Sequence, residues 1–191
     1  MAREMQFDSN WVEAYFNQGI DVVNRRVFLG DIDAESIDHA VKGFYLMQTE
    51  NETEPIELFI SSYGGTIYDS LALYDVMQTI KCPVHTFAFS KCMSAALILL
   101  AAGESGHRWV AQHCFFLHHD GFDELEGKAT KLKADMKHLE EQNKAWTNLI
   151  VKLSNKNFKW WDDRAKRSAD FYFSADDSIE FGIADAIWSE K

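Results

Sequence analysis

The stretch "VHTFAFSKCMSAALILLAAG", residues 84–103, places a strand pattern directly before a helix pattern. Its first part, residues 84–90, is rich in β-branched and aromatic residues, which favour strands. The second part is an apolar run broken only by Ser94, and such a run with small residues around it predicts a buried helix. The stretch therefore predicts a strand that leads into a buried helix, with a serine at the junction.

The same alternation continues along the chain on both sides of this stretch. The predicted strands are residues 25–30, 55–62, 84–90, 107–111 and 114–119, and the predicted helices are residues 11–19, 33–50, 66–80, 94–103 and 127–154. Strands that alternate with helices are joined by βαβ crossovers, which build a largely parallel sheet. The sequence therefore predicts an α/β fold.

The composition predicts one globular domain that covers residues 1–191. A chain of 191 residues with 47% hydrophobic content is long enough for one sizeable core. The net charge of −11, without a dense run of Lys or Arg, argues against a nucleic-acid-binding protein. The longest apolar run is far shorter than the roughly 20 residues that span a bilayer, so no contact with a membrane is expected.

The cysteines and the first residues indicate a cytoplasmic protein. Cys82, Cys92 and Cys114 are odd in number and lack CxxC spacing, which is typical of reduced thiols rather than of a disulfide framework. The opening "MAREMQFDSN" has no apolar segment of the kind found in secretory signals.

The predicted helix of residues 127–154 carries an apolar stripe with a seven-residue repeat. The repeat consists of Leu132, Leu139, Trp146 and Leu153, with Met136 and Ile150 on adjoining positions and Asn143 as an interruption. Such a stripe packs either on the core of its own chain or on a helix from another subunit. Periodicity alone leaves both interpretations open.

Four features of the sequence could carry chemistry: the Gly64–Gly65 pair after a strand, Ser94, the "LHHDG" segment and Asp170. Hydrolysis by a serine needs a neutral imidazole beside the hydroxyl, a carboxylate that orients the imidazole, and donors for the oxyanion. A strand-to-helix turn exposes a hydroxyl near unpaired backbone N–H groups, and a glycine pair lets the backbone approach a substrate carbonyl. Each feature alone is more often purely structural, because serines commonly begin helices and glycine pairs commonly form turns.

Two other chemistries deserve comparison with the serine. Residues 113–120, "HCFFLHHD", contain several zinc-ligand types, but neighbouring side chains on a strand point to opposite faces. Cys114 and His118 share a face yet lie about 13 Å apart along an extended strand. We therefore expect no metal and no cofactor. Cys92 lies two residues before Ser94 and lacks the helix-start position that lowers a thiol pKa, so the serine is the better nucleophile.

Taken together, these segments resemble the ClpP family, the proteolytic subunits of the Clp proteases. "NRRVFLGDID" is similar to the first strand and turn of that family, "PIELFISSYGG" to its strand ending in Ser-Pro-Gly-Gly, and "MSAALILLAAG" to its nucleophile segment. "GIADAI" is similar to the closing Gly-Leu-Val-Asp-Ser-Ile. The match from Gly65 to Gly127 runs without a gap.

The resemblance implies a role for five residues. Ser94 is the nucleophile, His119 the general base and Asp170 the orienting acid, and the backbone N–H groups of Gly65 and Ala95 form the oxyanion hole. His118 takes the apolar position that precedes the base. The family fold is a crotonase-like spiral of βαβ units, and residues 127–154 correspond to its long handle helix.

The resemblance further implies a serine endopeptidase of the ATP-dependent protease type that cleaves unfolded polypeptides. It implies a homo-oligomer of stacked heptameric rings, a tetradecamer, with the active sites inside and a Clp-type AAA+ unfoldase as partner. Three alternatives keep the family resemblance: a non-catalytic ring subunit, a phage head-maturation protease, and an acyl-CoA enzyme of the same fold.

The chain departs from the family pattern at four places, of which the first is an N-terminal stretch unlike the axial loop of the family, which bears on docking of the unfoldase partner. Tyr63 replaces the proline before the glycine pair, which predicts a less rigid oxyanion turn. Ala95–Ala96 replaces Met-Gly, which keeps the backbone donor but alters a pocket wall. Residues 120–129, "DGFDELEGKA", replace the glycine-rich handle strand, which bears on contacts between rings.

Overall fold

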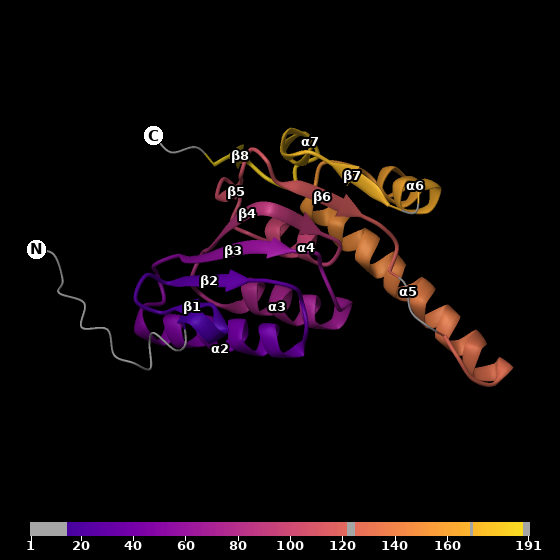
Figure 1. The fold of residues 1–191 in the computed structure, drawn as a ribbon, viewed down its shortest axis with the longest axis horizontal. Helices are drawn as coiled ribbons and strands as arrows, with labels where there is room; N and C mark the ends of the chain where they lie inside the picture. The colour runs from indigo at the N-terminus through magenta and orange to yellow at the C-terminus, as the bar shows by residue number, and fades with distance from the viewer. Residues whose placement is uncertain (1–14, 122–124, 169, 189–191) are drawn as a thin grey trace, which may run out of the picture.

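The structure, a computed structural model, describes residues 15–121, 125–168 and 170–188 (Figure 1). Its named elements are β1 (Ile20–Asp21), β2 (Arg26–Leu29), α2 (Ala34–Glu50), β3 (Ile56–Ser62), α3 (Ile67–Thr79), β4 (Val84–Met93), α4 (Ala96–Ala101), β5 (Arg108–Val110), β6 (Phe115–His118), α5 (Ala129–Leu153), α6 (Phe158–Ser168), β7 (Phe171–Phe173), α7 (Ala175–Glu180) and β8 (Ala186–Ile187). Every strand and helix that the sequence predicts from residue 25 onward is present. Of the helix predicted over residues 11–19, residues 15–18 are helical and residues 11–14 lie outside the described residues.

The described strands form one eight-stranded sheet in the order β1-β2-β3-β4-β5-β8, with β6 beside β4 and β7 beside β6. Strands β2, β3, β4, β5 and β8 pair in parallel, and β6 pairs in parallel with β4. Only the β1–β2 and β6–β7 pairs are antiparallel among the described strands. The predicted α/β fold with a largely parallel sheet is therefore confirmed.

Strand β4 has two different partners along its length. Residues 86–88 pair with β5, whereas residues 91–93 pair with β6. Between these two segments Ser90 adopts a left-handed φ of 63°, and the pairing with β3 shifts register between Ile60 and Ser62. Irregularities of this kind twist a strand and redirect its end. The C-terminal end of β4 therefore leaves β5 and continues beside β6.

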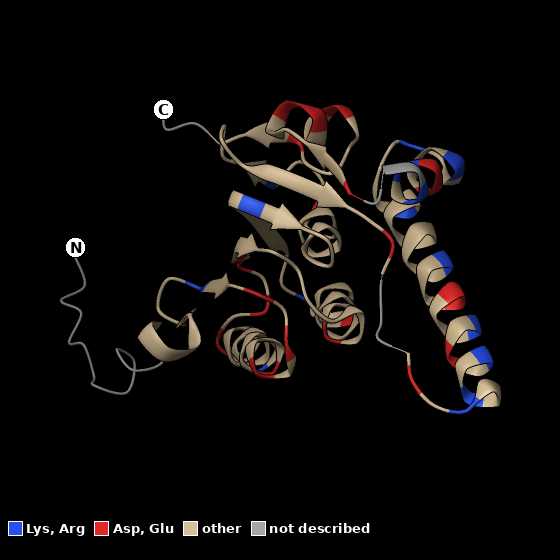
Figure 2. Cartoon of the chain, turned by 45° about the vertical axis from the view of Figure 1, so that its right-hand side comes forward, with Lys and Arg blue, Asp and Glu red and all other residues tan. Residues whose placement is uncertain are grey.

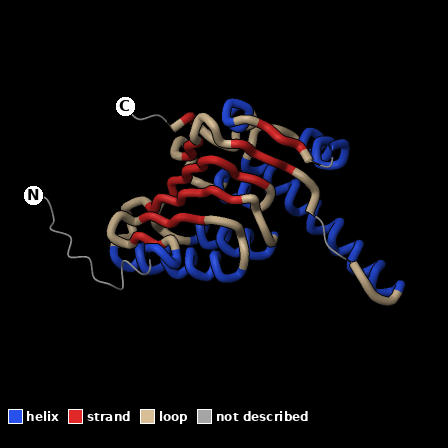
Figure 3. Tube along the Cα trace, in the orientation of Figure 1, coloured by secondary structure: helices blue, strands red, loops and turns tan. Residues whose placement is uncertain are grey.

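The two faces of the sheet differ in character. On one face Ile56, Leu58 and Ile60 of β3 are fully buried, and α2 and α3 lie along that side (Figure 1, Figure 3). The opposite face carries an aromatic row in which neighbouring rings stack with centroids 4.7–5.1 Å apart; its members are Phe28, Phe59, Phe87 and Trp109. The sheet thus has one face buried under helices and one face covered by a ladder of aromatic rings.

Helix α4 lies at the centre of the hydrophobic core. All six of its residues are buried, which explains why the run that follows Ser94 has no polar face. Side chains of neighbouring elements satisfy its ends: Ser70 Oγ donates to the Ala95 carbonyl at 3.2 Å, and Thr86 Oγ1 donates to the Leu100 carbonyl at 2.8 Å. None of the described helices combines the length and apolar character that crossing a membrane requires.

Helix α5 has two halves with different environments. In its C-terminal half Trp146, Thr147 and Ile150 are buried against the core of the chain. The N-terminal half projects away from the body of the molecule (Figure 1), and Met136 there is 54% exposed. Positive and negative side chains alternate along this half (Figure 2). Packing on the chain's own core therefore accounts for the apolar stripe only from Trp146 onward.

His118 ends β6 inside the core. Its side chain is 1% exposed, its ring meets the Trp161 ring edge to face at 4.9 Å, and neither ring nitrogen has a hydrogen-bond partner within the described residues. Burial lowers the pKa of His118 from its ordinary 6.5 to about 4. The imidazole is therefore uncharged at neutral pH and acts as an aromatic core residue.

This burial predicts a loss of stability in acid. Below pH 6.5 the unfolded chain binds a proton at His118, whereas the folded chain binds this proton only when the pH nears 4. The free energy of unfolding therefore decreases as the pH falls between these values. Replacing His118 by phenylalanine should lower the acid-induced loss of unfolding free energy between pH 7 and pH 5 by about 2 kcal/mol. Urea unfolding at fixed protein concentration measures this difference, with His113→Phe at an exposed histidine as control. Equal pH dependence in the parent and His118→Phe would contradict the assignment.

Candidate active site

Ser94 lies at the junction between β4 and α4, as the sequence predicts. Its backbone N–H donates to the Leu117 carbonyl of β6 at 2.8 Å, which extends the β4–β6 pairing by one residue. Its φ of 51° falls in the left-handed region that non-glycine residues seldom adopt. Such strain is characteristic of residues held in place for function, and here it turns the chain sharply from strand to helix.

His119 follows the last residue of β6. Met93 at the end of β4 pairs with Leu117 in β6, so the residues after these two parallel strands emerge at the same edge of the sheet. His119 Nε2 lies 2.7 Å from Ser94 Oγ, and the histidine side chain is 19% exposed. The parallel pairing of β4 and β6 therefore places an imidazole nitrogen within hydrogen-bond distance of the serine hydroxyl.

Asp170 approaches the same histidine from the other side. It precedes β7, which pairs antiparallel with β6 in a register that sets His118 opposite Phe171. Asp170 Oδ1 lies 3.5 Å from His119 Nδ1, a separation suited to an ion pair but longer than a good N–H···O hydrogen bond. The Asp170 side chain is 47% exposed, so the contact between Asp170 and His119 is weaker than the contact between His119 and Ser94.

The Gly64–Gly65 turn lies directly beside the serine. The Ile32 N–H donates to the Gly64 carbonyl at 2.7 Å, and the Thr66 N–H donates to the Ile32 carbonyl at 3.1 Å. These two hydrogen bonds involve the Gly64 carbonyl and the Thr66 N–H but not the Gly65 N–H, which can therefore donate to another acceptor. Ala95 is the N-cap residue of α4, at the helix end where N–H groups have no intrahelical acceptor. Both amides therefore fit the role of oxyanion donors.

Only glycine fits at these two positions. A Cβ on Gly64 would lie 2.7 Å from the Ser94 Cβ, and one on Gly65 would lie 1.9 Å from the Ile32 carbonyl oxygen. The φ values of 101° and 150° also belong to the region that side chains disfavour. The turn can therefore pack tightly against the serine because both residues lack side chains.

Replacing Gly65 by alanine should lower kcat for peptide hydrolysis by about 100-fold, the usual cost of losing one oxyanion donor. The added methyl group must push the turn away from Ile32, and the Gly65 N–H moves with it. A peptidase assay with circular dichroism as a folding check measures the effect. Gly30→Ala is the matched control, because a Cβ at Gly30 meets nothing within 4 Å. Unchanged kcat in Gly65→Ala would remove this amide from the site.

Tyr63 stands where the family pattern has a proline. Its backbone N–H, which a proline lacks, donates to Asp31 Oδ1 at 2.8 Å, and the Lys91 ammonium lies 4.4 Å from the centre of its ring. The turn before Gly64 is therefore tied to the segment after β2. The Asp31 carboxylate therefore provides a hydrogen bond at the position where the family has a proline, and the expectation of a less rigid turn stays a prediction.

A cleft of about 490 Å³ opens above the serine. The proposed site residues Gly65, Ser94, Ala95 and His119 line one part of it. The other lining residues are Tyr63, Thr66, Ile67, Tyr68 and Gly121, together with Leu139, Gln142 and Trp146 of α5. The cleft is therefore bounded by the sheet edge on one side and by α5 on the other, and its walls are largely apolar and aromatic.

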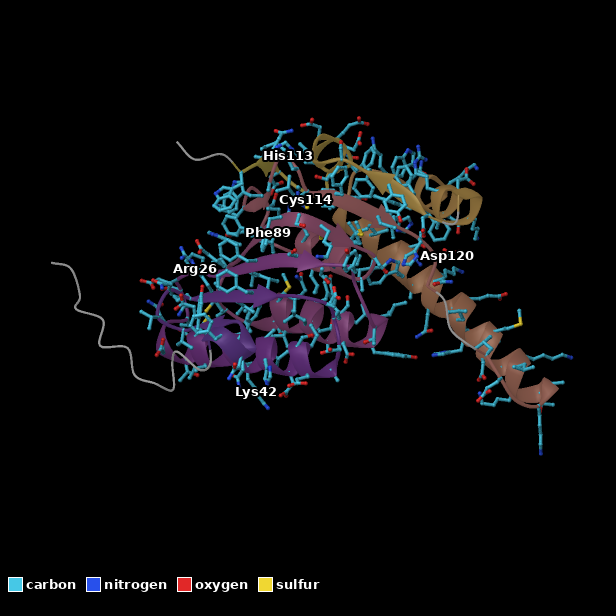
Figure 4. The ribbon with its side chains drawn as sticks, viewed as in Figure 1. Arg26, Lys42, Phe89, His113, Cys114 and Asp120 are labelled. Carbon is cyan, nitrogen blue, oxygen red and sulfur yellow. The ribbon has the colours of Figure 1, made fainter. Side chains whose placement is uncertain are left out.

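The other nucleophile and metal interpretations find no support in the geometry. Cys92 is fully buried, and burial raises its thiol pKa well above the ordinary value of 9.0. Cys114 is buried as well, with its pKa raised to about 12. His113 and Cys114 lie at one end of β6, whereas Asp120 lies beyond its other end near α5 (Figure 4). The zinc-ligand types of residues 113–120 therefore do not converge.

Sequence reasoning missed the role of Asn143. Its side chain accepts a hydrogen bond from the Gly121 N–H at 2.9 Å and donates to the Gly121 carbonyl at 3.3 Å. This pair of bonds fixes the segment after His119 to α5. The signal was present in the sequence, because Asn143 interrupts the apolar stripe of the helix. Residues 122–124, part of the segment that departs from the family handle, lie outside the described residues.

The fold and the cleft define an α/β protein with a serine–histidine pair where two parallel strands end. The family model for the Clp protease matches residues 15–191, which is most of the chain. The chain therefore belongs to the Clp protease family, and the resemblance noted from its sequence is confirmed. Membership of this family implies a peptidase. Clp proteases in general assemble into oligomeric rings.

Proposed function

We propose that this protein is a serine endopeptidase subunit that cleaves unfolded polypeptides within an oligomeric chamber. The observation that carries the proposal is the 2.7 Å approach of His119 Nε2 to Ser94 Oγ beside the Gly65 and Ala95 amides. A hydroxyl, a base and oxyanion donors that line one cleft are the parts that acyl transfer needs.

In the proposed reaction Ser94 Oγ attacks the carbonyl carbon of a peptide bond, and its proton passes to His119 Nε2. The carbonyl oxygen becomes an oxyanion that accepts hydrogen bonds from the Gly65 and Ala95 N–H groups. When the intermediate collapses, the C–N bond breaks and His119 returns the proton to the leaving amine. Water then attacks the acyl-enzyme by the same route, which releases the acid and regenerates the serine.

Asp170 is proposed to orient the base. A carboxylate near Nδ1 favours the tautomer with the proton on Nδ1, which leaves the Nε2 lone pair free to accept the serine proton. It also stabilises the imidazolium that forms during attack. The 3.5 Å separation between Asp170 and His119 suits this role in a resting enzyme, because catalytic hydrogen bonds often shorten when substrate binds.

Assembly into stacked heptameric rings, a tetradecamer, is proposed to enclose the sites. One chain cannot surround a chamber, and the projecting half of α5 carries Leu132 and Met136, neither of which packs into the core of its own chain. A partner helix from another ring would cover this stripe. A closed chamber admits only unfolded chains, which is why a Clp-type AAA+ unfoldase in the cytoplasm is the proposed partner; family membership supports that partner.

The non-catalytic ring subunit is the main rival, because it shares the fold and the assembly. Ser94, His119 and Asp170 are all retained and adjacent, which favours the active enzyme. The phage head-maturation protease would use the same residues, and no described feature favours it over the Clp-type enzyme. An acyl-CoA enzyme of the same fold would have no need of a serine beside the histidine.

The test measures the mass of the assembly by gel filtration and the peptidase activity of the same eluted fractions. The purified protein should elute from gel filtration far above the 22.0 kDa of one chain and should cleave a short fluorogenic peptide without other proteins. Leu132→Lys should lower the mass of the assembly, whereas Ala134→Lys, which adds the same charge at an exposed position off the stripe, should not. An assembled but inactive protein would support the non-catalytic subunit, and an active monomer would contradict the chamber.

A further inference from the structure

Two histidines and a glutamate gather at the start of β4, at the opposite end of that strand from Ser94. His85 is the second residue of β4, and Glu104 and His107 lie in the turn between α4 and β5. Backbone hydrogen bonds join the two segments: the Glu104 N–H donates to the Val84 carbonyl at 2.8 Å, and the Thr86 N–H donates to the His107 carbonyl at 3.0 Å. Val84 and Thr86, which flank His85, are thus hydrogen-bonded through the backbone to Glu104 and His107.

The turn that carries Glu104 and His107 is itself held in place. The His107 N–H donates to the Glu104 carbonyl at 2.9 Å, and the Gly106 N–H donates to Asp185 Oδ2 at 2.8 Å. The Trp109 ring meets the His85 and His107 rings edge to face at 5.7 and 5.3 Å. The turn is therefore held by backbone hydrogen bonds, and the two histidine rings pack against Trp109.

The potential ligand atoms of this cluster lie close together. His85 Nε2 is 3.1 Å from Glu104 Oε2, His107 Nδ1 is 3.6 Å from the same oxygen, and all three atoms lie within 4.8 Å of one another. Zinc binds imidazole nitrogen at about 2.0–2.1 Å and carboxylate oxygen at about 2.0–2.2 Å, so ligand atoms of one ion lie within about 4 Å of each other. The three atoms are therefore near the spacing of a common ion, although the rings must also turn toward it.

His107 Nδ1 supplies a second observation. This atom is buried and has no hydrogen-bond partner within the described residues, although it faces the Glu104 carboxylate and the His85 ring. Buried polar atoms without a partner are uncommon in native proteins and call for an explanation such as an ion. The 3.6 Å separation between His107 Nδ1 and Glu104 Oε2 is too long for a good hydrogen bond. A metal ion held by both atoms would give each of them a partner.

We propose that His85, Glu104 and His107 bind one divalent transition-metal ion, with zinc as the best match. Two imidazoles and one carboxylate are a preferred donor set for zinc, and imidazole favours such ions over magnesium or calcium. The site is separate from the proposed serine site and from residues 113–120. Glu104 and His107 side chains are 45% and 44% exposed, which leaves solvent access for entry and for a water as fourth ligand.

Binding of a metal ion requires the His85 and His107 rings to change their orientation. The His85 and His107 rings stack with centroids 4.1 Å apart and planes 10° from parallel. A metal lies in the plane of each imidazole that holds it, so the stacked rings must rotate apart to share an ion. The bound ion would then link the start of β4 to the α4–β5 turn through side chains, in addition to the backbone hydrogen bonds. Its expected role is to stabilise this end of the sheet.

The experiment titrates the full-length, untagged protein with Zn²⁺ in a calorimeter and with Co²⁺ in a visible spectrometer. The parent should bind one equivalent of zinc per chain at this site and should unfold at a higher temperature in its presence, because the folded state alone presents the ligands. His85→Phe and His107→Phe keep an aromatic ring beside Trp109 and remove the ligand nitrogen. Each should abolish this binding step and the rise in unfolding temperature.

Two controls keep the outcome decisive. His113→Phe makes the same change at an exposed histidine outside the cluster, and His119→Ala removes the histidine beside Ser94; both should keep the zinc equivalent. Glu104→Gln should weaken binding at least tenfold while leaving the unfolding temperature of the metal-free protein within a few degrees of the parent. Absence of zinc binding by the parent, or its loss in His119→Ala but not in His107→Phe, would overturn the proposal.

Discussion

Replacing Ser94 by alanine is expected to lower kcat for a short fluorogenic peptide by about 10⁴–10⁶-fold. The alanine variant lacks the oxygen that forms the acyl-enzyme, so the covalent route is closed. The residual rate would come from the amides of Gly65 and Ala95 acting on water. KM should change little, because the hydroxyl is a small part of the cleft surface.

The matched control is Ser90→Ala, which makes the same substitution on β4 at an exposed position. This variant should keep the activity of the parent. Both proteins should elute at the same mass in gel filtration, which excludes a loss of assembly as the cause. Comparable activity of Ser94→Ala and the parent would exclude the serine as nucleophile.

Replacing Asp170 by asparagine is expected to lower kcat by about 10³-fold. Loss of an orienting aspartate in the well-known serine protease triad costs about 10⁴-fold, because the imidazole then adopts the wrong tautomer. The smaller effect expected here follows from the 3.5 Å separation and from the 47% exposure of the Asp170 side chain, which let solvent share in orienting the ring. KM should stay unchanged, since Asp170 does not line the cleft.

The loss of kcat in Asp170→Asn is best compared with that in Asp120→Asn. Asp120 follows His119 directly, and burial raises its carboxyl pKa, with the nearby Lys166 opposing that shift. If Asp120 were the orienting acid, Asp120→Asn would cause the larger loss of kcat. We expect the opposite order, because the closest approach of a carboxylate to His119 Nδ1 in the described residues is that of Asp170. A larger effect at Asp120 would therefore reassign the third residue of the site.

Much of the fold can be predicted from the sequence, because it depends on local patterns. The alternation of β-rich runs with apolar helices up to residue 154 reflects how each element is buried in the core, and from residue 25 onward the structure contains all of these elements. The elements β1, α6, β7, α7 and β8 escaped prediction. Strands β7 and β8 have only three and two residues, which is too short for an alternating pattern.

The site is less accessible to sequence reasoning than the fold. The junction after β4 and the glycine pair are local features, so Ser94 and Gly65 could be selected from residue patterns together with the family resemblance. The pairing of Asp170 with His119 depends on the antiparallel register of β6 and β7, which no local pattern encodes. The restraint on Tyr63 by Asp31 likewise joins residues far apart in sequence.

The central claim is that Ser94 is an activated nucleophile, and mass-spectrometric mapping of a fluorophosphonate adduct tests it most directly. Such reagents phosphonylate a serine only where a base accepts its proton and amides stabilise the oxyanion. We predict one adduct per chain, on Ser94, in the parent and in Ser90→Ala, with strongly slowed labelling in His119→Ala. An adduct on another residue, or full labelling of Ser94→Ala, would contradict the account.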